Sequence, residues 1–101
     1  MTRVEVDHGI CGFETTVTIV KNDDYTVSAS IESTCSNLSG IPPELLTFDP
    51  VMEMTSAGSL LGKLEKYITH PSCLIVPALI KAAEVEAGLA LRKDACIQFI
   101  D

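Results

Sequence analysis

Hydrophobic and polar residues alternate with a period of two through most of the first third of the chain. Val4 and Val6 are separated by charged residues, and the runs 13–19 and 25–31 each carry one apolar face. The polar stretch 21–24 separates the two longer runs. A period of two is that of a β-strand with one buried face, so the pattern predicts a short first strand followed by an antiparallel β-hairpin.

After the second of these runs the alternation stops, and proline residues divide the chain into short segments. A Ser-Thr pair, which makes a good N-cap, precedes Cys35, so a short helix is expected to begin near Cys35 and to end before Pro42. Pro43 is expected to start a further turn, which ends at Pro50.

Apolar residues recur at intervals of three and four in the second half of the chain, which is the period of an amphipathic helix. The intervals predict one helix over residues 60–68 and a more apolar helix over residues 75–87. Proline is tolerated only in the first turn, so either the regular helix begins at Pro77 or residues 72–76 form a separate turn. Gly88 is a suitable residue to end this helix.

The last six apolar-rich residues, 95–100, predict a final strand. Strands followed by helices and one more strand are typical of an α+β fold. We therefore expect a two-layer domain with N-terminal antiparallel strands that include a hairpin, about three helices on one face and a C-terminal strand. The 101 residues are enough for a single domain with one core.

The charge balance limits the partners that the protein is expected to have. There are 14 acidic and 7 basic residues, and the basic ones adjoin only at Arg92 and Lys93. Such a surface repels phosphate backbones and anionic lipid. No apolar stretch approaches the roughly 18 residues of a membrane span, and the N-terminus lacks the apolar core of a secretory signal. A cytoplasmic protein with neither a nucleic-acid nor a membrane partner is expected.

The cysteines and histidines form the most distinctive pattern in the sequence. Both histidines begin a His-x-x-Cys motif, His8 with Cys11 and His70 with Cys73, and both motifs lie at junctions between predicted elements. Cys35 also lies at such a junction. Strand ends and helix N-termini often gather at one rim of a two-layer domain, so we expect these five side chains to meet there.

Thiolate and imidazole groups are the usual ligands of zinc and of softer iron sites. The pattern therefore predicts a site in which Cys11, Cys35 and Cys73 hold a zinc ion or an iron–sulfur cluster. His70 or His8 would complete the ligand set. A reduced compartment is consistent with free thiols, because the sequence shows no secretory signal.

Two other interpretations of the cysteines remain open. Cysteine often packs as a small hydrophobic side chain, and the protein would then be a non-catalytic interaction module, with the surplus apolar face of helix 77–87 buried in a homodimer. A thiol-based redox protein is the other alternative. Cys96 belongs to the predicted last strand and is left out of the site. The sequence contains no Gly-x-Ser-x-Gly motif, Walker loop or dinucleotide fingerprint, so no enzymatic reaction is predicted.

The chain resembles a small family of uncharacterised single-domain proteins over nearly its full length. The resemblance is carried by Cys11-Gly12-Phe13, by Ser33-Thr34-Cys35, by Cys73 with Pro77, Lys81, Ala82 and Glu84, and by Gly88-Leu89-Ala90-Leu91. The family implies no activity. The resemblance does favour Cys11, Cys35 and Cys73 as a set over Cys96.

Overall fold

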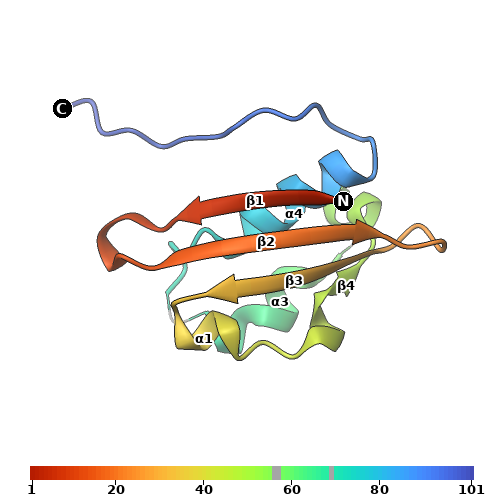
Figure 1. Cartoon of the computed structure of the whole chain (residues 1–101), viewed down its shortest axis with the longest axis horizontal. Coiled ribbons are helices and arrows are strands. Elements are labelled where there is room, and N and C mark those ends of the chain that lie inside the picture. The colour runs from red at the N-terminus through yellow and green to blue at the C-terminus, as the bar shows by residue number, and fades with distance from the viewer. Residues whose placement is uncertain (56–57, 69) are drawn as a thin grey trace.

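A computed structural model describes residues 1–55, 58–68 and 70–101, and its N-terminal part is a four-stranded antiparallel sheet (Figure 1). The strands lie in the order β1-β2-β3-β4, so each strand pairs with its neighbour in sequence. Their bounds are Thr2–Asp7 for β1, Glu14–Lys21 for β2, Val27–Ser33 for β3 and Thr47–Phe48 for β4. The predicted first strand and hairpin are confirmed, whereas the two-residue strand β4 was not predicted.

Seven helical segments are described, and most of them are a single turn long. The α-helices are α1 (Ser36–Ser39), α2 (Pro50–Met54), α3 (Leu60–Leu64) and α4 (Ile75–Glu86), and the 3-10 turns are η1 (Gly9–Cys11), η2 (Pro43–Leu46) and η3 (Glu65–Tyr67). Within the described part of the chain, no helix combines the length and the apolar character needed to cross a membrane.

Two of the predicted helical boundaries are wrong. Pro50 begins α2 instead of ending the preceding turn, because the Asp49 carboxylate caps α2 by accepting a hydrogen bond from the backbone N–H of Val51 at 2.9 Å. The predicted helix over residues 60–68 is divided into α3 and η3. One face of this segment is nevertheless buried, since Leu60 and Leu64 are inaccessible to solvent.

Helix α4 forms the second layer, and it lies against β1 and β2 behind the sheet (Figure 1). Its side chains Leu79 and Ala83 and the strand residues Val17 and Ile19 are fully buried in one core cluster. The structure therefore has the predicted two-layer α+β architecture. The expected surplus apolar face of α4 is absent, because its apolar side chains other than Pro77 are buried or half-buried within the chain itself.

Helix α4 begins at Ile75, so neither the expected start at Pro77 nor a separate turn over residues 72–76 is found, whereas its end before Gly88 is as predicted. Pro77 lies in the first turn, where its missing N–H leaves no hydrogen bond unmade. At the other end Gly88 takes a φ of +77°, and its N–H donates to the carbonyl of Val85 while that of Leu89 donates to the carbonyl of Glu84. This pair of hydrogen bonds is the Schellman motif, which favours glycine at this position.

The predicted C-terminal strand is wrong. Residues 91–101 form no strand, and all of them are exposed in an extended segment that passes beyond the outer edge of β1 (Figure 1). The prediction relied on the local apolar pattern of residues 95–100, but a strand also needs a hydrogen-bonding partner. No described strand of this chain pairs with the segment.

Glu86 joins the end of α4 to the sheet. Its carboxylate accepts hydrogen bonds from the hydroxyl of Thr2 at 2.8 Å and from the backbone N–H of Lys21 at 3.1 Å. The Thr2 hydroxyl is the largest cause that lowers the pKa of Glu86 below its ordinary value of 4.5. A lowered pKa in the folded state means that the ionised carboxylate stabilises the fold.

We therefore expect Glu86→Gln to reduce the pH dependence of stability. In the wild type, the contribution of Glu86 is present above the unfolded pKa and is lost as the pH falls through the folded pKa. Urea unfolding between neutral pH and about pH 3 should show a smaller loss of stability for Glu86→Gln than for the wild type. Glu84→Gln on the same helix is the control, and an equal effect of both variants would contradict this role.

Candidate functional site

The five residues singled out by their spacing line one hollow of about 280 Å³. The β1–β2 connection contributes His8 and Cys11, the start of α1 contributes Cys35, and the segment before α4 contributes His70 and Cys73. These segments lie together at the end of the sheet where β1 finishes and β2 begins (Figure 1). Apolar side chains complete the wall, among them Phe13, Leu38 and, from η3, Tyr67. Cys96 does not line this hollow and is exposed in the C-terminal segment.

Cys11 is held on a tight turn between two glycines. Gly9 and Gly12 take φ values of +79° and +73°, a conformation that residues with a side chain rarely adopt. The turn is closed by a hydrogen bond from the N–H of Gly12 to the carbonyl of Gly9 at 2.9 Å. The Cys11 thiol is exposed and donates a long bond of 3.8 Å to the carbonyl of His8. That bond is weak, so the thiol is held loosely.

The other two thiols are half-buried at the beginnings of helices. Cys35 is the N-cap residue of α1, and its backbone N–H donates to the hydroxyl of Ser33 at 3.0 Å. The N–H of Cys73 donates to the carbonyl of His70 at 3.2 Å, which closes the turn before α4. The second His-x-x-Cys spacing therefore forms a turn, and this turn places both of its side chains on the same hollow.

Two hydroxyl groups connect His8 to Cys35. Nε2 of His8 lies 2.7 Å from the Thr15 hydroxyl, which in turn lies 2.8 Å from the Ser33 hydroxyl. Ser33 accepts the bond from the backbone N–H of Cys35. Thr15 is only 2% exposed, so its hydroxyl is a fixed partner that orients the His8 ring.

The two imidazoles use different nitrogens for their hydrogen bonds. Nε2 of His8 is engaged with Thr15, which leaves Nδ1 of that ring for a ligand. Nδ1 of His70 lies 3.1 Å from the Ser72 hydroxyl, which leaves its Nε2. Partial burial is the main cause that lowers the pKa of His8 below 6.5; the positive charge of His70 acts in the same direction and Asp7 opposes it. The lowered pKa favours the neutral form of His8, which is the form that binds metals.

The side chains are near one another without forming a finished coordination sphere. As they stand, no three or more His, Cys, Asp or Glu side chains among residues 1–55, 58–68 and 70–101 are arranged to hold a metal ion. The Cys11 and His70 side chains are exposed, and both lie on turns between elements.

Thr15 and Ser33 are the residues that the sequence interpretation missed. Thr15 shares a strand face with Val17 and Ile19, which are fully buried. A polar side chain on an otherwise apolar face must find a hydrogen-bond partner, so its position was a signal that a polar contact lies there.

The fold and this hollow define a small α+β protein with a site lined by thiols and imidazoles. The chain belongs to DUF6951, a family of unknown function whose family model matches residues 2–99. The resemblance to a small uncharacterised family is thereby confirmed. No curated protein and no solved structure gave a match.

Proposed function

We propose that the hollow binds a zinc ion or an iron–sulfur cluster through Cys11, Cys35 and Cys73, with His70 or His8 as a further ligand. The observation that supports this most is that three separate parts of the chain bring all five side chains to one hollow of about 280 Å³. Packing alone gives no reason for both histidines and every junction cysteine to share one surface.

The thiol and imidazole groups of these residues suit a zinc ion or an iron–sulfur cluster. Zinc is commonly held by three thiolates and one imidazole, and iron–sulfur clusters are held by cysteine thiolates. Binding deprotonates the thiols, so the weak bond from Cys11 to the carbonyl of His8 would be replaced by a bond from sulfur to metal. His8 meets the requirement for a neutral imidazole, because its pKa is lowered.

A zinc ion and an iron–sulfur cluster would give the protein different roles. A zinc ion would fasten the β1–β2 connection, α1 and the segment before α4 to one another. An iron–sulfur cluster would support electron transfer, sensing or the handling of a cofactor. The zinc ion or the cluster would bind the folded protein and not the unfolded chain. At a concentration 100 times its Kd it would add about 2.7 kcal/mol to the free energy of unfolding.

The test is metal analysis together with ultraviolet–visible spectra of anaerobically purified full-length protein. We expect metal in the wild type, with a visible charge-transfer absorption if the ligand is an iron–sulfur cluster. Cys35→Ser and Cys73→Ser should lose most of the metal. Cys96→Ser is the matched control and should retain it, because Cys96 is exposed and does not line the hollow.

Two results would contradict the proposal. One is a colourless protein that lacks metal and takes up neither zinc nor a cluster reconstituted from iron and sulfide. The other is a disulfide between two of the three thiols in protein purified without reductant, accompanied by no metal uptake after reduction. The second result would favour the thiol-based redox interpretation.

A further inference from the structure

Strand β1 leaves one side of the sheet open. Among residues 1–55, 58–68 and 70–101 it pairs with β2 alone, and the backbone N–H and C=O groups on its other side face away from the sheet. An unpaired edge of this kind is a template for another strand. The edge runs over all six residues of Thr2–Asp7.

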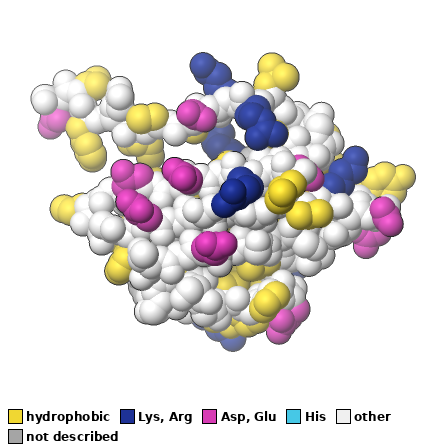
Figure 2. Space-filling view, viewed as in Figure 1, with side chains coloured by type: hydrophobic (Ala, Val, Ile, Leu, Met, Phe, Trp, Pro, Cys, Tyr) yellow, Lys and Arg dark blue, Asp and Glu magenta, His cyan; other side chains and the backbone are white. Residues whose placement is uncertain are grey.

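The C-terminal segment has the sequence of a strand, but no strand in the described part of the chain pairs with it. Ala95, Ile97 and Phe99 alternate with Cys96 and Gln98. Ile97 is 77% exposed and Phe99 is 93% exposed. Hydrophobic side chains of this segment stand clear of the body of the protein (Figure 2). The family model continues to residue 99, so the segment is part of the family's domain.

We propose that residues 95–100 of one copy pair with the free edge of β1 in a second copy, antiparallel to it, to form a symmetric dimer. Each chain then supplies one strand and receives one, which gives a closed two-fold interface. The added strand is held by main-chain hydrogen bonds, as in other cases of strand addition to a sheet edge.

The direction of the segment favours a second copy as the partner. In Figure 1 the segment leaves α4 near the start of β1 and runs in the same direction as β1. Pairing within one chain would therefore be parallel, which is the less stable arrangement per residue. A second copy can approach with its segment reversed and form the antiparallel arrangement.

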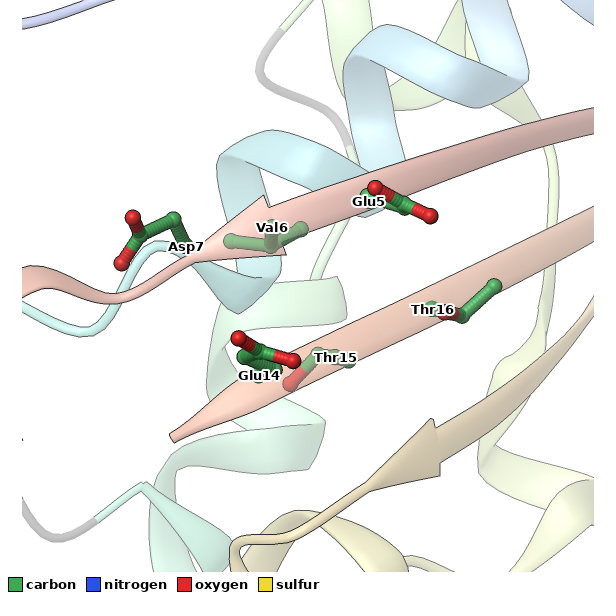
Figure 3. Close-up of a pocket in the computed structure, with 6 residues that line it drawn as sticks. All are labelled: Glu5, Val6, Asp7, Glu14, Thr15 and Thr16. Atoms are coloured by element: carbon green, nitrogen blue, oxygen red, sulfur yellow. The ribbon is translucent and has the colours of Figure 1, made fainter. Parts of the chain in front are cut away.

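The charges also favour the reversed direction. Glu5, Asp7 and Glu14 line a second hollow, at the end of β1 and the start of β2 (Figure 3). In an antiparallel pair, the adjacent Arg92 and Lys93 of the second copy would lie beyond Asp7, next to these carboxylates. In a parallel pair within the chain, the two basic residues would lie at the opposite end of β1.

Side chains alternate between the two faces of a strand, so the apolar side chains of residues 95–100 can extend the hydrophobic core beneath β1. Thr2 and Val6 are buried and Val4 is half-buried beneath β1, on the face that packs against α4. A register that places Ile97 and Phe99 on this face would remove both from water. Gln98 and Cys96 would then share the outer face with Glu5.

Sedimentation velocity of the full-length protein over a range of concentrations tests this pairing. We expect a dimer, and we expect Ile97→Asp and Phe99→Asp each to weaken dimerisation by roughly tenfold or more. Leu61→Asp replaces an apolar residue that is 61% exposed on α3 and should leave dimerisation unchanged. Arg92→Glu combined with Lys93→Glu should also weaken the dimer, and added salt should reduce the difference.

Amide hydrogen exchange, together with the oligomeric state, distinguishes this dimer from a monomer whose segment is free or pairs with its own β1. The amides of residues 95–100 should be protected in the dimer and unprotected in the Phe99→Asp variant. A monomer at all concentrations would overturn the proposal, whether its segment is protected on its own β1 or unprotected. A dimer that is insensitive to both aspartate substitutions would also overturn it. Metal content is expected to be the same in these variants, so failure here is distinguishable from failure of the proposed metal site.

Discussion

Replacing Leu79 with alanine is expected to lower the free energy of unfolding by about 2–5 kcal/mol. Leu79 has no exposed surface and lies in the core cluster on the face of α4 that covers β1 and β2. The substitution removes apolar surface from the core and leaves a cavity that the surrounding side chains fill only in part. Urea denaturation followed by circular dichroism measures the loss.

Leu61→Ala is the matched control for this experiment. Leu61 is 61% exposed on α3, so its truncation should change the free energy of unfolding by about 0.5 kcal/mol or less. Equal destabilisation by the two substitutions would show that α4 does not carry the core in the way the structure indicates.

Replacing Thr15 with valine is expected to weaken metal binding by about 10- to 100-fold if His8 is the histidine that completes the proposed metal site. Valine keeps the shape of threonine but removes the hydroxyl that joins His8 to Ser33. The ring of His8 then loses its orienting partner, and the fold should also lose about 0.5–1.5 kcal/mol, since the hydroxyl of Ser33 loses a partly buried hydrogen bond. A competition titration against a chelator of known affinity measures the change in metal affinity.

Thr15→Ser retains the hydroxyl and controls for the hydrogen bonds. It should bind the metal close to the wild-type affinity while losing some stability through its missing methyl group. If Thr15→Val binds metal as tightly as the wild type, the relay from His8 to Cys35 does not support the site. Stability is measured on the metal-free forms so that the two effects remain separate.

The elements predicted well from sequence are those whose local pattern and tertiary partner agree. The hairpin of β2 and β3 follows from strict alternation, because its two strands pair with each other and need nothing distant. Helix α4 follows from its apolar spacing together with Pro77 in its first turn and Gly88 after its end.

The elements predicted wrongly depend on contacts that sequence does not show. Pro50 is compatible with the end of one turn or the start of the next, and only the hydrogen bond from Val51 to Asp49 decides in favour of the second. The strand β4 is two residues long and exists because β3 offers it a partner. Residues 95–100 have the alternation of a strand, but none of the strands that the structure describes pairs with them.

The candidate site, like the fold, could be predicted from the sequence only in part. The repeated His-x-x-Cys spacing singled out the two turns that contribute to the hollow, and the junction position of Cys35 added the third segment. The hydroxyl relay could not be predicted in the same way, since Thr15 and Ser33 meet only when β2 and β3 are in register.

The order of the strands has a consequence for how the chain folds. Because β1, β2 and β3 are neighbours both in sequence and in the sheet, their pairing closes only short loops and costs little chain entropy. The contact of α4 with β1 joins distant parts of the chain, so we expect its formation to be the slow, entropically costly step. The site hollow is completed by the segment before α4, so we expect it to form only when α4 docks, after the sheet has formed.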